Sequence, residues 1–221
     1  PAIILNNTVE GYRKYAESGD ITMPDIYPNF IVGGDSGKPI SNVYSQMKAS
    51  GEVSSRIPWC TPQAFNYGDY GRSGQRAPNF TELRNMHYQA LLAGTTGFCW
   101  YTFTHLDCDP EVYLGVAQLL KEAGILQDLW FNGHRREMLP TGNAEVFAAA
   151  YPGVNGCDYI IAVNSTTSSK KVSLPASGKT YYAAGEKKSF TPVNGKLSDT
   201  LEKYQSRVYV TDRKLAESFS L

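Results

Sequence analysis

Apolar and polar positions between residues 56 and 103 follow an order that predicts strand, long loop, helix and strand. Residues 56–65 begin apolar and end in aromatic and amide side chains, and a loop rich in Gly and Asn follows over 66–79. Residues 81–94 show helical periodicity, and 96–103 form a second apolar run. This order predicts a βαβ unit whose two strands lie parallel.

The predicted helix at 81–94 has defined ends. Its apolar stripe occupies positions i, i+3, i+7 and i+8, namely Leu83, Met86, Ala90 and Leu91. Asn79 or Thr81 can cap the start, and Gly94 stands where a left-handed C-terminal residue is favoured.

The same alternation extends toward the N-terminus. Two further strands are predicted near residues 2–6 and 21–27, and the second closes with the motif Asp25-Ile-Tyr27-Pro28. Helices are predicted at 9–18, 40–49 and 110–130. Four strands alternating with helices indicate an α/β domain.

From about residue 135 the pattern changes to short strands separated by closely spaced Gly-containing turns. The predicted strands are 145–151, 158–164, 170–174, 179–182 and 206–211. They predict a small antiparallel β-sandwich. We therefore expect two domains, 1–132 and 133–221.

Motifs in the first domain resemble the last strands of a glycoside hydrolase (β/α)8 (TIM) barrel. They are Pro58-Trp59, Gln63-Ala64-Phe65, Ala77-Pro78, Glu82-Leu83-Arg84, Tyr88, Ala90, Gly94, Gly97-Phe98 and Trp100-Tyr101. The resemblance covers roughly residues 1–132. It implies that the strands end in a sugar-binding cleft, and that the trailing β-sandwich packs on the barrel as a stability module.

A complete barrel has eight strands and ~250 residues, whereas this domain offers four. Half a barrel leaves open parallel edges and an uncovered core. We therefore expect the first half to exist, in the same precursor or as a second chain, and the sequence has no initiating Met. A smaller open α/β sheet is the alternative.

Composition narrows the function. The chain has 221 residues, 42% of them hydrophobic, and 21 basic and 21 acidic residues that cancel. This balance gives no electrostatic footprint for nucleic acid or an anionic membrane, and no apolar run approaches the ~20 residues of a membrane span. Because no GxGxxG or GxxxxGK[ST] motif occurs, we expect no nucleotide or other cofactor.

Sequons and cysteines suggest secretion. Asn6, Asn79 and Asn164 each begin an Asn-X-Ser/Thr sequon. If the two βαβ strands are neighbours, Cys60 and Cys99 lie close enough for a disulfide, and Cys108 offers another; buried free thiols are the alternative. We expect no metal site, since neither CxxC nor HxxxH spacing occurs.

Glycoside hydrolysis needs two carboxyl groups across the scissile bond. The resemblance implies a proton donor upstream of residue 1 and a nucleophile at the end of the seventh strand. At that place this chain has Gln63. Its neutral amide can hydrogen-bond a sugar hydroxyl but cannot attack an anomeric carbon. Asp25, at a predicted strand end, is the candidate catalytic carboxylate. A hydroxyl-binding or structural Asp before Pro28 is the alternative.

Aromatic and polar side chains near the strand ends are the candidate substrate-binding residues, because rings stack on sugar faces. They are Tyr27, Gln63, Phe65, Trp100, Tyr101 and His105. Since strand side chains alternate, one of Trp100 and Tyr101 faces the cleft, and we expect Trp100. Core packing of Trp100 and a surface position for His105 are the alternatives.

Two functions follow. The first is a secreted glycoside hydrolase acting on O-glycosidic bonds, of which this chain is the C-terminal part, inactive by itself. The second is a non-catalytic extracellular glycoprotein with the same fold and a carbohydrate-binding or structural role, which the amide of Gln63 favours.

Overall fold

The computed structural model describes residues 1–102, 109–131 and 135–220. The chain divides into two compact units, 1–118 and 119 onward. This division falls inside α4 (Pro110–Ile125), whereas the sequence predicts a boundary after residue 132.

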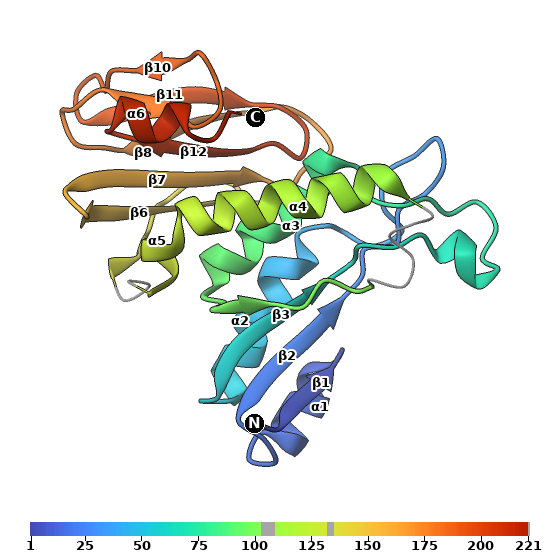
Figure 1. Ribbon diagram of the computed structural model, residues 1–221. Helices are drawn as coiled ribbons and strands as arrows, with labels where there is room; N and C mark the ends of the chain where they lie inside the picture. The colour runs from blue at the N-terminus through green and yellow to red at the C-terminus, as the bar shows by residue number, and fades with distance from the viewer. Residues whose placement is uncertain (103–108, 132–134, 221) are drawn as a thin grey trace. The chain divides into compact units, whose positions relative to one another are not determined.

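The first unit contains a parallel four-stranded sheet in the order β1-β2-β3-β4 (Figure 1). Its strands are β1 (Ile3–Asn6), β2 (Ile21–Ile26), β3 (Ile57–Pro62) and β4 (Gly97–Phe98). The four predicted strands are therefore present and parallel. The last is shorter than expected, although an isolated parallel bridge joins Gln63 to Tyr101 beyond it.

Helices connect consecutive strands, as the sequence predicts. They are α1 (Val9–Tyr15), α2 (Asn42–Val53) and α3 (Phe80–Ala93), and a 3-10 helix, η1 (Tyr67–Tyr70), lies in the loop after β3. Asn79 caps α3 in a capping box with Glu82, and Gly94 ends it with φ of 102°. Because Gly94 adopts a left-handed conformation, its lack of a Cβ stabilises this end.

The two faces of the parallel sheet differ in cover. On one face, Ile4 and Cys60 are buried together with Tyr12 of α1. On the other face, Ile3 and Ile57, which are both register partners of Ile21, are 47% and 53% exposed. One face is thus packed under helices and the other leaves apolar side chains uncovered.

The expected Cys60–Cys99 disulfide is wrong. Cys60 and Cys99 are free thiols, the first buried and the second exposed. Cys60 is the register partner of Phe98, so Cys99, one residue further, points to the opposite face. Cys157 is also free, and Cys108 lies outside the described residues.

The second unit is antiparallel. It contains a six-stranded sheet in the order β10-β9-β12-β7-β6-β5 and a two-stranded sheet, β11-β8. The elements are α5 (Gln127–Phe131), β5 (Glu137–Met138), β6 (Val146–Val154), β7 (Cys157–Asn164), β8 (Lys170–Pro175), β9 (Tyr181–Ala183), β10 (Ser189–Phe190), β11 (Lys196–Leu201), β12 (Ser206–Val210) and α6 (Arg213–Glu217). The five predicted strands are present; β5, β10 and β11 were not predicted.

Both sheets of this unit contribute to one apolar core. Ala148, Ile160 and Tyr209 of the six-stranded sheet cluster with Leu174 and Leu197 of the two-stranded sheet. All five are fully or nearly fully buried. The unit is therefore a β domain built on a shared core.

A buried cation joins the two sheets. The guanidinium of Arg207 on β12 is paired with Asp199 on β11 and, at 2.8 Å, with Glu186. Tyr209 donates a further hydrogen bond to Asp199 at 2.7 Å. The Arg207 side chain is 2% exposed and that of Asp199 11%, so this pair is shielded from solvent, whereas the Glu186 side chain is 29% exposed.

Asn164 does not fit a glycosylation site. The residue is fully buried at the end of β7, and its amide donates to the backbone carbonyls of Ser168, Leu201 and Glu202. A glycan on this nitrogen would have no room and would break these bonds. The expectation for this sequon is therefore wrong in the folded chain.

Candidate functional site

Polar side chains converge at the carboxyl ends of the parallel strands. Asp25 on β2 is the register partner of Thr61 on β3, so both point to the same face. Gln63, two residues after Thr61, shares that face and pairs with Tyr101. The C-terminal edge of a parallel sheet is where ligand sites of α/β proteins form.

Asp25 is half-buried, and its Oδ1 has no hydrogen-bond partner. Burial raises the pKa of this carboxyl, while its own backbone N–H and the charge of Lys38 oppose the shift. Two nearby oxygens share its condition, since Asn29 Oδ1 and Thr61 Oγ1 are also buried without a partner. Buried polar atoms of folded proteins are nearly always paired, so three together mark this edge as a candidate site.

Five aromatic rings gather beside Asp25. Phe65 is central, with ring centroids 5.2 Å from Tyr27, 4.7 Å from Tyr67, 5.4 Å from Tyr70 and 5.5 Å from Tyr101. Tyr27 and Tyr101 stack at 5.9 Å. We call these five residues the aromatic cluster.

The aromatic cluster is partly open. Tyr70 and Tyr101 are 47% and 43% exposed, whereas Phe65 is 2% exposed. The Arg72 guanidinium lies over the Tyr67 ring at 4.3 Å. Phe65 is thus the buried ring against which the tyrosines pack, and the exposed tyrosines offer flat surfaces to a ligand.

Sequence reasoning missed Tyr67 and Tyr70 as site residues. They lie on η1 in the Gly-rich loop after β3, where Asn66 accepts a hydrogen bond from the Gly68 N–H at 2.7 Å. The signal was two aromatic residues in a loop that follows a strand end. Loop aromatics with no apolar periodicity are candidates for binding.

Tyr101, and not Trp100, joins the aromatic cluster. The Trp100 ring is stacked with His87 of α3 at 6.1 Å and with Phe98 at 5.8 Å, because it points to the helix-covered face. The expectation that Trp100 faces the cleft is therefore wrong. Burial lowers the pKa of His87 to about 3, so this imidazole is neutral and does not serve as an acid near neutral pH.

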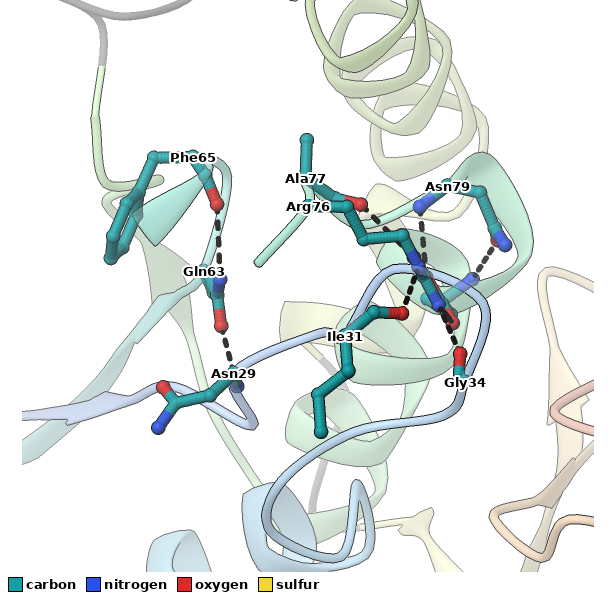
Figure 2. A network of polar contacts seen from close by, with 9 residues as sticks. Asn29, Ile31, Gly34, Gln63, Phe65, Arg76, Ala77 and Asn79 are labelled. Atoms are coloured by element: carbon teal, nitrogen blue, oxygen red, sulfur yellow. Dashed lines mark hydrogen bonds and ion pairs between the residues drawn. The ribbon is translucent and has the colours of Figure 1, made fainter. Parts of the chain in front are cut away.

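The side chain of Gln63 bridges two backbone segments, at Asn29 and at Phe65. Its Nε2 donates to the Phe65 carbonyl at 3.0 Å, and its Oε1 accepts from the Asn29 N–H at 3.0 Å (Figure 2). The side chain is fully buried, and both ends of the amide are used. This geometry gives Gln63 a structural role in place of the expected contact with a ligand.

Arg76 fixes the loops around the site. Its guanidinium forms a bidentate pair with Glu82, both distances 2.7 Å, and donates to the carbonyls of Ile31 and Gly34 (Figure 2). The Glu82 side chain is 3% exposed. The loop after β2 is thereby tied to the start of α3 by charge-assisted hydrogen bonds.

A cavity of about 270 Å³ lies against Asp25. It is lined by Asn7, Thr8, Asp25, Ile26, Tyr27, Pro28, Lys38, Asn42, Gln46 and Tyr67. Among these described residues Asp25 is the one carboxylate. Tyr27 and Tyr67 belong to both the cavity and the aromatic cluster.

The other predicted sites are less informative. His105 lies outside the described residues. Asn79 is exposed at the start of α3, whereas Asn6 is half-buried and its Oδ1 accepts hydrogen bonds from Asn7 and Thr8.

In the described part of the chain, no group of three or more His, Cys, Asp or Glu residues is placed to hold a metal ion. Nor does any described helix have the length and apolar character needed to cross a membrane.

The fold is similar to that of glycoside hydrolases. A putative alpha-galactosidase from Bacteroides fragilis matches 96% of this chain with a TM-score of 0.57 and 14% identity. An alpha-amylase from Geobacillus thermoleovorans, complexed with acarbose, matches 94% with a TM-score of 0.53 and 11% identity. AmyP in complex with maltose matches 92% with a TM-score of 0.51 and 12% identity.

These neighbours are longer than this chain, which spans 47%, 58% and 60% of their lengths, respectively. No family model matches the sequence, and no curated protein matches it. At such identities the likeness defines a fold and leaves activity to the site.

Proposed function

We propose that this chain is the C-terminal part of a secreted glycoside hydrolase acting on O-glycosidic bonds of a carbohydrate. The observation that carries the proposal is the position of Asp25. It lies at a strand end of a glycoside hydrolase-like fold, beside the aromatic cluster and in the wall of a cavity. Glycoside hydrolysis requires a pair of carboxyl groups, of which Asp25 would be one, and the rings offer flat surfaces to a sugar.

Asp25 suits proton transfer. Because burial raises its pKa, the carboxyl keeps a proton to higher pH than an exposed Asp does, which favours general acid or base chemistry. Hydrolysis also needs a second carboxyl group. We propose that it comes from the part of the barrel that this chain does not supply.

The uncovered face of the parallel sheet supports that completion. Ile3, Leu5 and Ile57 are 47%, 54% and 53% exposed on one face, whereas parallel sheets are covered on both faces. We propose that further βα units, in the same precursor or in a second chain, cover these residues and close a TIM barrel. The β unit is then the β-sandwich that follows the barrel in the chain.

Substitution of Asp25 tests the function. In the complete native protein, Asp25→Asn should reduce turnover of aryl glycosides by ~10²–10⁴-fold, because the amide does not transfer the proton. Glu52→Gln, at an exposed position of α2, is the matched control and should leave turnover unchanged. Equal rates for Asp25→Asn and the unaltered protein would overturn the catalytic role.

A non-catalytic carbohydrate-binding protein is the second candidate. It is supported by Gln63, a neutral amide whose two ends are already engaged. Under this reading the complete protein binds sugars, hydrolyses none of them, and keeps its affinity in Asp25→Asn within about twofold. Binding by calorimetry and turnover with the same sugars separate the two candidates.

Glycosylation is proposed at Asn79 and Asn6. The exposed Asn79 side chain caps α3 through Oδ1, which leaves the geometry of an attached glycan compatible with the cap. Removal of N-glycans from secreted protein should lower the mass of the peptide that contains Asn79. An unchanged mass for both sequon peptides would contradict the proposal.

A further inference from the structure

The cavity beside Asp25 is formed by several parts of the first unit, including the loop that carries Lys38 and the start of η1 at Tyr67. Asn7 and Thr8 follow β1, Asp25 and Tyr27 lie at the end of β2, and Asn42 and Gln46 belong to α2. Its volume of about 270 Å³ lies just below the ~300–1,000 Å³ of pockets for drug-sized ligands. The space therefore suits a ligand of about one ring.

Amide groups dominate the polar lining. Asn42 and Gln46 stand four positions apart on α2, so their side chains share one face of the helix. Within the described part of the chain, no hydrogen bond engages the side-chain amides of Asn7, Asn42 or Gln46. An amide offers a donor and an acceptor, as a sugar hydroxyl does.

Charges in the cavity balance. Asp25 and Lys38 are the two ionisable residues of opposite sign in its lining, and they interact electrostatically. One carboxylate and one ammonium give the lining no net charge that would attract an ion of either sign. The amide groups therefore decide the polar ligand, and they match hydroxyl groups.

The cavity continues from the aromatic cluster. Tyr27 and Tyr67, whose ring centroids are 6.4 Å apart, belong to both. Asp25 lies in the cavity wall beside them. A chain of sugars could therefore stack one ring on the exposed tyrosines and place the next ring among the amides.

We propose that this cavity is a second subsite for a neutral sugar ring, so that the ligand is an oligosaccharide of at least two residues. Asn42 and Gln46 hydrogen-bond the hydroxyls of the second ring. This inference rests on the proposed carbohydrate-binding function and adds the length of the ligand and two residues that recognise it.

The test compares sugars of different length. Affinities of the complete native protein are measured by calorimetry for neutral mono-, di- and trisaccharides of glucose and galactose. The double variant Asn42→Ala/Gln46→Ala should lose ~10-fold in affinity for di- and trisaccharides, since the hydrogen bonds of both amides to the second ring are removed. Monosaccharide affinity should change less than twofold.

Matched variants show whether the loss of affinity comes from the missing hydrogen bonds. Gln46→Met keeps the side-chain length without the hydrogen bonds and should reproduce part of the loss. Lys48→Ala, at an exposed position of the same helix, should change nothing. Circular dichroism of each variant reports whether α2 is retained.

The outcomes separate this inference from the proposed function. If Tyr101→Ala weakens every sugar while the α2 variants match the unaltered protein at every length, the second subsite is wrong and the function stands. An equal loss for mono- and trisaccharides overturns it as well. If the unaltered protein binds no sugar, both proposals fall.

Discussion

Two places in this protein treat buried polar groups in opposite ways: the Arg207 network of the β unit and the strand ends of the parallel sheet. In the β unit, the guanidinium of Arg207 is paired with two carboxylates, and Tyr209 donates to one of them. At the strand ends of the parallel unit, Asp25 Oδ1, Asn29 Oδ1 and Thr61 Oγ1 are buried without partners. The first arrangement stabilises a fold, and the second leaves three polar atoms without a protein partner.

This difference indicates where chemistry belongs. A carboxylate that is fully paired has little capacity left for a substrate, whereas an unpaired, half-buried carboxylate has a shifted pKa and open lone pairs. The β unit therefore suits a stabilising role. The edge of the parallel sheet suits a site.

Removing Arg207 should have the largest effect on stability. Arg207→Met leaves Asp199 without its cation and leaves Glu186 with the more exposed Lys188 at 3.4 Å, and breaking a buried pair costs about 3–5 kcal/mol. When urea unfolding is monitored by hydrogen exchange, backbone amides in peptides from 135–220 should lose their protection at lower urea concentration than in the unaltered protein. Arg213→Met removes an exposed pair with Glu217 and should cause no measurable change; equal behaviour of the two variants would contradict the comparison.

Gln63→Leu should rank next. It leaves the Asn29 N–H and the Phe65 carbonyl unpaired in a buried place, at about 1–3 kcal/mol for each group. The folded state should be destabilised, and hydrogen exchange in urea should show the loss of protection chiefly in peptides from the first unit.

Gln63→Glu sharpens the same prediction. The new carboxyl can donate to the Phe65 carbonyl only when protonated, so its folded pKa should lie above its unfolded value. Stability should then be greatest below the unfolded pKa of ~4.3 and fall as pH rises. A flat pH profile for this variant would show that the amide bridge is not needed.

Tyr101→Ala should weaken sugar binding by ~10-fold, about 1.4 kcal/mol, because it removes an exposed ring of the aromatic cluster. Tyr101→Phe keeps the ring and should retain most of the affinity. Trp100→Phe, on the helix-covered face, is the comparison for general repacking. Calorimetry with the same sugars measures all three, and a larger loss for Trp100→Phe would reverse our assignment of the two faces.

The smallest effect concerns the pH dependence from Asp25. Burial raises its pKa, so the folded protein binds this proton more tightly than the unfolded chain. Its contribution to stability is complete below the unfolded pKa of ~3.9 and is lost as pH rises through the raised folded value. The melting temperature of Asp25→Asn, relative to the unaltered protein, should therefore increase from pH 3 to pH 7.

Lys38 provides the control for that measurement. Its charge lowers the pKa of Asp25, so Lys38→Met should move the pH-dependent loss to higher pH. A difference between Asp25→Asn and the unaltered protein that does not vary with pH would show that Asp25 has an ordinary pKa.

Periodicity and capping chemistry predicted most of the elements. The apolar stripe and caps of α3 fixed that helix to within a residue, and Gly-rich turns separated the longer β strands. The sequence missed β5 and β10, which have two residues each, because so short a run carries no alternation. It also missed β11, whose polar Lys196–Leu201 segment pairs at an edge.

The placement of the candidate residues was predicted only in part. Asp25, Tyr27, Phe65 and Tyr101 lie near one sheet edge, as strand-end positions suggested, and their contact with a ligand stays a prediction. The choice between Trp100 and Tyr101 depended on a one-residue register that sequence does not specify. The sequence does not reveal the structural role of Gln63, because its backbone partners Asn29 and Phe65 are brought to its two ends only in the folded chain.

The buried amide of Asn164 has a consequence for biosynthesis. A sequon is modified while the chain is still emerging, before its partners at Leu201 and Glu202 have been synthesised and folded against it. Any molecule that acquired a glycan there would be committed to a chain in which β7 could not close on the end of β11. In a host that glycosylates, the yield of native protein would therefore depend on whether β7 pairs and buries Asn164 before the glycosylating enzyme modifies it.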